Sequence, residues 1–297
     1  MPRRKPRIDD DEPRYPTARS APPDFDYSDD PVAGAGDRWS TWDLSRAGER
    51  GPKPYPDWLV TELAAVDVER GVLKTGKEAD VHLLWRGVPD TDRGCLLAAK
   101  RYRDARHRQF HRDAAYQEGR RVRRSREMRA MKTRTSFGRD LIAAAWAWAE
   151  FAALRTLWTA GAAVPYPVQI VGTEVLLEFI GDAGGAAAPR LAETRYRGAE
   201  LDPLWDQLVE QLVLLARCGY AHGDLSAYNL LVHDGRLVLI DLPQVVDVVA
   251  NPQGATFLDR DVRTVATWFN ARGRPTDVAA LVELLRWEAR LGSAAPG

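Results

Sequence analysis

The chain has 297 residues, of which 45% are hydrophobic, and its 42 basic and 42 acidic residues give a formal net charge of zero. This size and apolar content suffice for one bilobal core or two small ones. No apolar run reaches the ~20 residues of a membrane span, and the N-terminus lacks the apolar core of a signal peptide. We therefore expect a cytoplasmic protein without a membrane partner. Only two cysteines are present, each in an apolar stretch, which argues against a disulfide framework.

The first 53 residues are rich in proline, aspartate, arginine and serine and show no sustained hydrophobic period. Such a composition predicts a disordered tail over residues 1–53. Residues 55–70 are expected to form a short amphipathic helix that leads into the strands of a small N-terminal lobe.

A glycine-containing turn lies between residues 71 and 81. Residues 71–77 fit the Walker pattern Gly-x-x-x-x-Gly-Lys, but Glu78 stands where that loop needs a hydroxyl group for Mg²⁺. Residues 82–85 also continue as a strand instead of starting a helix, so we reject the Walker interpretation. The glycine-rich pattern of kinases is Gly-x-Gly-x-x-Gly-x-Val. When this pattern is aligned to end at Val81, Gly76 is the only one of its three glycines that is present, which alone is a weak match.

Lysine is scarce, since only six of the 42 basic residues are lysine. One of the six, Lys100, closes the apolar run 95–99, which is expected to be a buried strand. Residues 141–154 predict a helix on which Glu150 shares a face with Trp146. An unpaired carboxylate on an apolar face is costly, so we predict that Glu150 pairs with Lys100 and aims it at the phosphates of a nucleotide. The alternative is that Glu150 lies at the helix margin in water.

Positive charge is concentrated between residues 101 and 139, where fourteen arginines or lysines face four acidic residues. Such a stretch could neutralise the phosphates of RNA or of a ribosomal particle. The alternative is a solvated insertion between the lysine strand and the Glu150 helix.

Residues 203–217 predict a core helix that leads to His-Gly-Asp-Leu-Ser-Ala-Tyr-Asn at 222–229. Asp234-Gly235 then favours a two-residue type I′ turn between two short apolar runs. A hairpin about this turn places Asn229 opposite Ile240, so Asn229 and Asp241 should emerge at the same end. On the turn alone, an ordinary surface hairpin is the alternative. Two further helices are expected near residues 258–269 and 277–291.

The order and spacing of Asp224, Asn229 and Asp241 are typical of a kinase-type phosphotransfer site. In that chemistry the first aspartate orients and deprotonates the attacking hydroxyl, while the asparagine and the second aspartate hold the metal ions that bridge the phosphates. We therefore expect Asp224 and Asp241 to be catalytic and Asn229 and Asp241 to be metal ligands, with ATP and Mg²⁺ (or Mn²⁺) as cofactors.

From about residue 71 to residue 270 the chain resembles the RIO atypical protein kinases, and within them the first RIO subfamily. The motifs that carry this resemblance are Thr-Gly-Lys-Glu-Ala at 75–79, the helix around 146–157, Leu-Glu-Phe-Ile-Gly at 177–181, the 222–229 motif, and Ile-Asp-Leu-Pro-Gln-Val-Val at 240–246. The resemblance implies an ATP-dependent serine/threonine protein kinase, with ATPase activity as a further option. Its protein substrate is unknown from the sequence.

The resemblance also implies the nucleotide site. Thr75 and Lys77 would contact phosphate, and the segment around Glu178 would be the adenine-binding hinge. The implied ATP-binding residues are Thr75, Gly76, Lys77, Glu78, Ala79, Val81, Lys100, Glu150, Glu178 and Ile180. The sequence departs from the family at Ala227, where acidic or amide residues are usual, and at Pro243.

The implied fold class is α+β, a bilobal protein-kinase-like fold. Its N-lobe would cover residues 54–181, with a small β-sheet, a helix and the basic insertion 101–139. A reduced, mainly helical C-lobe would cover residues 182–297. This lobe would lack a conventional peptide-docking segment, because neither Asp-Phe-Gly nor Ala-Pro-Glu is found after residue 240.

Two other functions compete with the protein kinase. Small-molecule phosphotransferases of the aminoglycoside and choline kinase kind have a similar catalytic loop, but commonly with His-Pro-Gly before the asparagine, where this chain has Ser-Ala-Tyr. An ATP-switched assembly factor that binds RNA or ribosomal particles is the second alternative.

Overall fold

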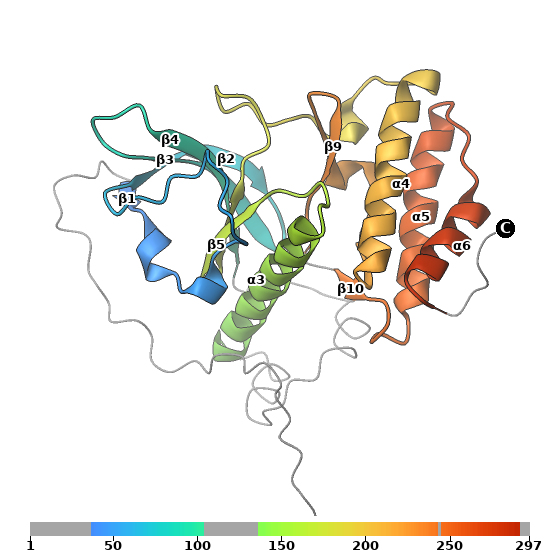
Figure 1. Cartoon of the computed structure of the whole chain (residues 1–297), viewed down its shortest axis with the longest axis horizontal. Coiled ribbons are helices and arrows are strands. Elements are labelled where there is room, and N and C mark those ends of the chain that lie inside the picture. The colour runs from blue at the N-terminus through green and yellow to red at the C-terminus, as the bar shows by residue number, and fades with distance from the viewer. Residues whose placement is uncertain (1–36, 104–135, 243–244, 292–297) are drawn as a thin grey trace, which may run out of the picture. The chain divides into compact units, whose positions relative to one another are not determined.

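An antiparallel sheet forms most of the N-terminal lobe in the computed structural model, which describes residues 37–103, 136–242 and 245–291. Within these ranges the sheet has six strands in the order β1-β2-β3-β4-β6-β5 (Figure 1). They are β1 (Asp37–Trp39), β2 (Val66–Thr75), β3 (Ala79–Gly87), β4 (Gly94–Tyr102), β5 (Pro167–Val171) and β6 (Glu174–Glu178). Strand β4, which carries Lys100, pairs with β3 on one side and β6 on the other. Its place inside the sheet explains why its apolar run is buried.

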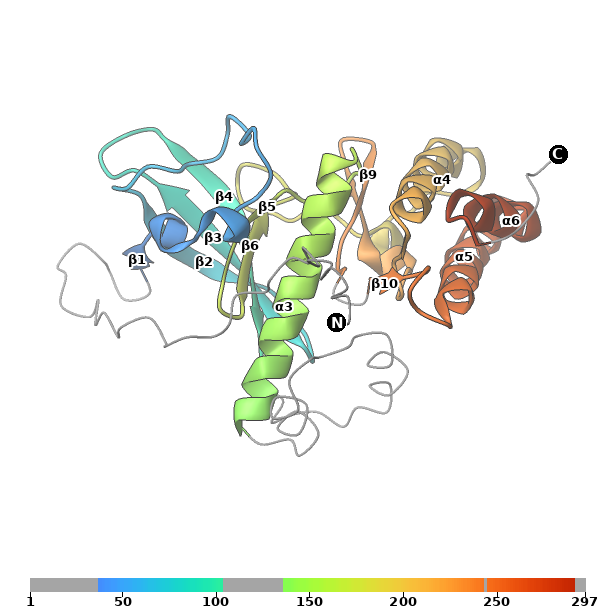
Figure 2. The same ribbon diagram turned by 60° about the horizontal axis from the view of Figure 1, so that its bottom comes forward.

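Helix α3 (Ser136–Thr159) connects the sheet to the C-terminal lobe (Figures 1 and 2). Ala147 and Phe151 pack in an apolar cluster with residues of the sheet. One turn further along, Leu154 and Leu157 belong to the core of the C-terminal lobe. Glu150 therefore lies where the two apolar clusters meet, which is the place for a residue that joins the lobes.

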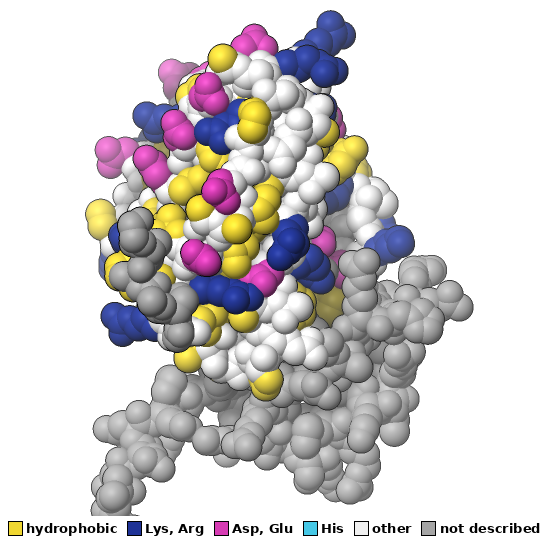
Figure 3. All heavy atoms as spheres, turned by 90° about the vertical axis from the view of Figure 1, so that its right-hand side faces the viewer, with side chains coloured by type: hydrophobic (Ala, Val, Ile, Leu, Met, Phe, Trp, Pro, Cys, Tyr) yellow, Lys and Arg dark blue, Asp and Glu magenta, His cyan; other side chains and the backbone are white. Residues whose placement is uncertain are grey.

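Three helices and two short β-ribbons form the C-terminal lobe of the described chain. The helices are α4 (Asp202–Arg217), α5 (Gly254–Ala271) and α6 (Val278–Glu288), and the ribbons pair β7 (Tyr220–Ala221) with β10 (Val246–Asp247) and β8 (Leu230–His233) with β9 (Arg236–Leu239). The predictions of helices at 141–154, 203–217, 258–269 and 277–291 are confirmed by α3 to α6. On the side where α5 and α6 lie, acidic and basic side chains are interspersed (Figure 3), and some pair, as Arg217 and Glu288 do at 2.8 Å.

The predicted disordered tail is wrong for residues 37–53. This segment forms β1 and two short 3-10 turns, η2 (Thr41–Leu44) and η3 (Ala47–Glu49). Trp42 is 4% exposed, meets Tyr55 edge-on at 5.2 Å between ring centres, and lies under the Arg50 guanidinium, 4.6 Å from the ring centre. Short 3-10 turns have no hydrophobic period, so the sequence pattern could not reveal them.

The helix expected at 55–70 is also absent from the described structure, where β2 starts at Val66. Asp67, within the expected helix, is fully buried and accepts two hydrogen bonds from Arg86 of β3, at 2.6 and 2.9 Å. Pairing of β2 with β3 has overridden the local helical pattern, because helix propensity is a weak preference compared with tertiary contacts.

Most of the basic stretch, residues 104–135, and residues 1–36 of the expected tail lie outside the described residues. The first arginines of the stretch are described and are used within the lobe. Arg101 pairs with Glu174 of β6 at 2.7 Å, and Arg103 pairs with Asp80 of β3. Among the described helices, none combines the length and the apolar character that crossing a membrane requires.

Candidate active site

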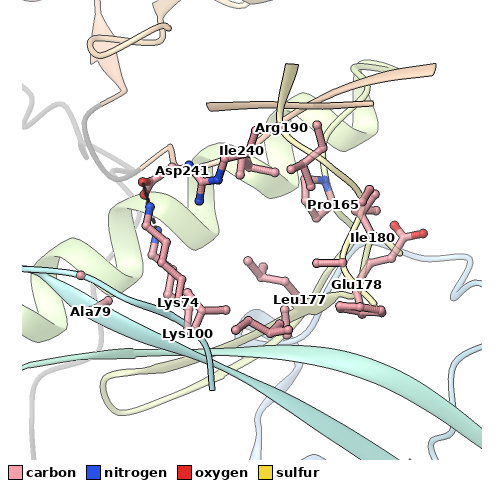
Figure 4. A pocket seen from close by; sticks show the side chains of 18 of the residues that line it. Lys74, Ala79, Lys100, Pro165, Leu177, Glu178, Ile180, Arg190, Ile240 and Asp241 are labelled. Atoms are coloured by element: carbon pink, nitrogen blue, oxygen red, sulfur yellow. Dashed lines mark hydrogen bonds and ion pairs between the residues drawn. The ribbon is translucent and has the colours of Figure 1, made fainter. Parts of the chain in front are cut away.

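A cavity of about 570 Å³ lies where the sheet, α3 and the β8–β9 hairpin meet (Figure 4). It is the site of most residues that the sequence indicates for nucleotide binding. Among the described residues, those predicted for the site and found in its lining are Gly76, Lys77, Glu78, Ala79, Val81, Lys100, Glu150, Glu178, Ile180, Asp224 and Asp241. Thr75 and Asn229 are not among the lining residues.

The β8–β9 hairpin brings the two predicted metal ligands to one end, as its turn predicts. Its two central residues, Asp234 and Gly235, have φ angles of 48° and 73°, which are the positive values that a type I′ turn requires. The Ile240 amide donates to the Asn229 carbonyl at 3.0 Å. Asn229 and Asp241 therefore emerge at the same end of the ribbon, and the predicted register is confirmed.

Asp241 has both of its carboxylate oxygens next to lysine ammonium groups (Figure 4). Lys100 Nζ lies 2.8 Å from Oδ1 and Lys74 Nζ lies 3.3 Å from Oδ2. Chiefly because of Lys100, and with a further contribution from Lys74, the pKa of Asp241 is held well below its usual range although burial acts in the opposite direction. Its backbone has a φ of 66°, a left-handed conformation that aspartate tolerates better than most residues.

Glu150 and Lys100 form the ion pair that the sequence predicts, at 2.7 Å. Both side chains are buried. Glu150 also accepts hydrogen bonds from the Tyr102 hydroxyl and from the Leu242 amide at 3.1 Å. Burial alone would lower the pKa of Lys100, but Glu150 and Asp241 outweigh it and raise that pKa above its ordinary value. Glu150 thus ties α3 to β4 and to the residue that follows Asp241.

The 222–229 motif holds Asp224 at the cavity, where Asp224 is exposed. Gly223, just before it, has a φ of 83°, a conformation that glycine adopts without strain. Asn229 donates from its amide nitrogen to the Asp224 carbonyl at 2.9 Å. Since the nitrogen is used in this bond, the amide oxygen is the atom of Asn229 that can serve as a metal ligand.

Asp261 of α5 supports this loop and was not identified from the sequence. Its carboxylate accepts from the amides of Gly223 at 2.7 Å and Leu225 at 3.1 Å. Burial raises the pKa of Asp261, as expected for a charge withdrawn from water. The sequence contains a signal for it: Asp261 lies on the same helical face as the buried Leu258 and Val265, so an acidic residue there needs buried donors.

The turn between β2 and β3 closes one end of the cavity. The Gly76 amide donates to the Ala79 carbonyl at 3.0 Å, and a Cβ atom at Gly76 would lie only 2.8 Å from that oxygen. Gly76 is therefore required by a close approach of the backbone. Thr75 is exposed. Lys74, which was not predicted for the site, lines this edge of the cavity together with Lys77 and reaches Asp241 Oδ2 at 3.3 Å.

The segment after β6 forms the opposite end. The Glu178 amide donates to the Tyr166 carbonyl at 2.9 Å, and the Glu178 carboxylate accepts from the Tyr166 amide at 3.0 Å. Burial raises the pKa of Glu178. The Ile180 carbonyl accepts from the Ala188 amide at 2.9 Å. The apolar residues lining the space between this segment and the hairpin include Val81, Ala98, Leu177, Leu231 and Ile240, so a flat apolar group has two walls to bind between.

Comparisons with known proteins agree with this architecture. A RIO domain model matches residues 94–281. The RIO-type serine/threonine-protein kinase Rio1 of Haloferax volcanii is 38% identical over 141 residues, covering 48% of this chain and 47% of that protein. The protein of the same name from Thermoplasma acidophilum is 30% identical over 149 residues, covering 50% of this chain and 76% of that protein.

Longer relatives and solved structures match as well. Serine/threonine-protein kinase RIO1 of Chaetomium thermophilum is 36% identical over 140 residues, covering 44% of this chain and 27% of that protein. The chain thus spans between about a quarter and half of the length of several curated relatives. Its fold is similar to the crystal structure of the Rio2 kinase from the same fungus, with a TM-score of 0.52 at 21% identity, covering 70% of this chain and 59% of that one.

The Rio2 likeness shows a bilobal α+β kinase-like fold, as the sequence predicts. The domain match extends from β4, through the Glu150 helix, residues 177–181 and the 222–229 motif, into α6, and covers more than half of the chain. The chain therefore belongs to the RIO domain family.

Proposed function

We propose that this chain is an ATP-dependent serine/threonine protein kinase of the RIO type. The observation that carries the proposal is the convergence of Asp224, Asp241 and the Lys100–Glu150 ion pair on one cavity. The relatives are named serine/threonine-protein kinases, which supports a protein substrate in preference to a small molecule.

The nucleotide would lie along the cavity from hinge to metal end. Adenine would bind between the apolar walls and use the backbone of residues 178–180. The phosphates would point toward Gly76, Lys77 and Lys100, because amide and ammonium donors are the groups that hold phosphate oxygens. Lys100 is placed for this role by Glu150, 2.7 Å away.

The oxygen atoms of Asp241 and Asn229, at the end of the cavity away from the hinge, fit a hard divalent cation. Asp241 supplies carboxylate oxygens and Asn229 an amide oxygen, and Mg²⁺ is usually held by one or two such ligands together with substrate phosphates. Mg²⁺, or Mn²⁺, would neutralise charge that develops on the phosphates. A related Rio2 kinase, similar in fold with a TM-score of 0.50 and 20% identity, was crystallised as an ADP/Mg²⁺-phosphoaspartate complex, covering 69% of this chain and 56% of that one.

Asp224 would act on the attacking hydroxyl. The hydroxyl oxygen attacks the γ-phosphorus, its proton passes to the Asp224 carboxylate, and the bond from the γ-phosphorus to the bridging oxygen breaks so that ADP leaves. The exposed position of Asp224 at the cavity allows a hydroxyl of another molecule to approach it. Asp261 keeps the loop in place through two buried hydrogen bonds.

A second candidate activity is ATP hydrolysis through a phosphorylated aspartate. The specific observation that favours it is the phosphoaspartate in the Rio2 complex, and Asp241 is the candidate acceptor here because it lies at the metal end of the cavity. An acyl phosphate is cleaved by hydroxylamine, whereas a serine or threonine phosphate is not, so this treatment of the labelled protein separates the two activities.

The proposal is tested by comparing Asp224→Asn with Asp241→Asn in transfer of radiolabelled γ-phosphate to lysate proteins and in ATP binding. Asp224→Asn should keep Mg²⁺-dependent ATP binding and lower transfer by about two to four orders of magnitude, the usual range for general-base catalysis. Asp241→Asn should weaken the Mg²⁺-dependent binding itself. Small and equal effects of both substitutions would refute the assignment of roles.

A further inference from the structure

Two lysines approach Asp241, and they differ in how they are held. Lys100 is buried and also bonds to Glu150 at 2.7 Å. Lys74, near the end of β2, reaches Asp241 Oδ2 at 3.3 Å with a side chain that is 40% exposed. A lysine ammonium on a flexible four-carbon stem can change partners without moving the backbone. Lys74 is therefore the one of these two lysines that can move.

The charges around Asp241 balance before a nucleotide arrives. Lys74 and Lys100 carry two positive charges, and Glu150 and Asp241 carry two negative charges, within one connected set of ion pairs. A divalent cation that binds Asp241 needs a carboxylate oxygen, and a cation beside an ammonium group on the same oxygen is strongly repelled at low dielectric. The arrival of the metal thus requires one ammonium to leave, and Lys100 is retained by Glu150.

The next acceptors for Lys74 would be the phosphates themselves. Lys74 lines the same cavity as Gly76 and Lys77 of the β2–β3 turn, and Figure 4 shows its side chain extending along one edge of the cavity from the sheet toward Asp241. A triphosphate placed along that edge would lie between the sheet and Asp241. Its oxygens would then be within reach of the ammonium that Asp241 releases.

We propose that Lys74 is a movable phosphate ligand, which contacts Asp241 and turns to the terminal phosphates when a nucleotide binds, whether or not a metal ion occupies Asp241. This inference rests on the proposed function, because it needs a nucleotide in the cavity. Its physical consequence is that Lys74 supplies part of the positive charge that the metal would supply to the phosphates. Without a divalent cation, Lys74 remains to neutralise the phosphates, so nucleotide binding should depend less on Mg²⁺ than it would without this lysine.

The test measures dissociation constants of ATP by calorimetry, in EDTA and in excess Mg²⁺, for the full chain and its variants. Lys74→Met should weaken binding in EDTA by about tenfold or more, the range expected for a lost charge-assisted hydrogen bond. The dissociation constant in Mg²⁺ should change less, so that the ratio of the dissociation constant in EDTA to that in Mg²⁺ increases. Lys74→Arg should keep the wild-type ratio to within about threefold, since the charge is retained. The dissociation constant of ADP should change in the same way as that of ATP, whereas the dissociation constant of AMP should be the same with and without Lys74.

Arg70→Met is the matched control, because Arg70 is exposed on the same strand and its side chain lies over Trp85. Removing its charge should leave the ratio unchanged. Lys74→Gln provides a second neutral variant if Lys74→Met unfolds, as shown by a thermal melt. A ratio in both neutral variants equal to that of Arg70→Met would overturn the role of Lys74. Failure of the wild-type chain to bind ATP in either medium would instead refute the proposed function and this inference with it.

Discussion

At the scale of single residues, Asp241 is constrained through both its backbone and its side chain. Its backbone has a positive φ, its two oxygens contact two lysines, and the amide after it is held by Glu150. Functional residues often lie in such sparsely populated conformations, where the surrounding structure holds them. The carboxylate is thereby kept ionised and oriented before any metal binds.

The depressed pKa of Asp241 predicts a pH dependence of stability. Because its pKa is lowered from 3.8 in the folded chain, its contribution is fully present above that value and is lost as the pH falls from 3.8 toward the depressed pKa. The free energy of unfolding of Asp241→Asn should therefore be below that of the wild type near neutral pH, and the difference should shrink in acid. Urea unfolding at several pH values measures this difference.

The control for this series is Asp90→Asn, which changes an exposed aspartate in the turn between β3 and β4. It corrects for acid effects that do not arise from the two lysines. A difference between the wild type and Asp241→Asn that grows as the pH falls below 3.8 would contradict the assigned charge state.

At the scale of elements, the site depends on three pieces of the chain that meet at Glu150. Strand β4 supplies Lys100 and Tyr102, α3 supplies Glu150, and the hairpin ends at Asp241. Each piece is locally regular, and each has an apolar face packed in one of the described cores. The polar residues at their junction are satisfied by one another, which removes much of the cost of burying them.

A double-mutant cycle on Lys100→Met and Glu150→Gln tests this junction. We expect a coupling energy of about 0.5–3 kcal/mol in stability, as for other residues that share a network, together with a large loss of phosphate transfer from either single substitution. Urea unfolding of the four proteins gives the coupling. Pairing Lys100→Met with Glu288→Gln, which lies in an exposed pair with Arg217, should give additive effects, and an additive result for Lys100 and Glu150 would contradict the ion-pair role.

At the scale of the whole described molecule, residues 37–53 extend the N-terminal lobe beyond the expected boundary. Trp42 joins the core cluster that contains Tyr166 and Val168. The Gln169 amide donates to the Thr41 hydroxyl at 2.8 Å, and the same Gln169 accepts from the buried Arg86 at 3.0 Å. The segment therefore covers β5 and its neighbours from the side.

Trp42→Ala should destabilise the protein by about 3–5 kcal/mol, the usual cost of removing a large buried aromatic side chain. Thermal or urea unfolding measures the change. Trp287→Ala is the matched control, because Trp287 is 42% exposed on α6, and it should cost less than about 1 kcal/mol. Equal losses for both tryptophans would show that residues 37–53 do not stabilise the fold.

The sequence by itself determined those features that depend on local order. The spacing of Asp224, Asn229 and Asp241, the Asp234-Gly235 turn with its register, and the helices at α3 to α6 all follow from short-range chemistry, such as turn preferences and helical period. The Lys100–Glu150 pair could also be predicted from the sequence, because a lone charge at the end of an apolar run needs a partner.

Only the tertiary structure decided the boundary of the N-terminal lobe, the start of β2 and two further residues of the cavity and its support. Residues 37–53 fold because Trp42 packs in one cluster with Tyr166 and Val168. Residues 66–70 join a strand because Asp67 meets Arg86. Lys74 and Asp261 belong to the site because β2 and α5 are brought beside Asp241 and the catalytic loop. These contacts join residues far apart in the chain. They depend on burial and charge in three dimensions, which local propensity does not encode.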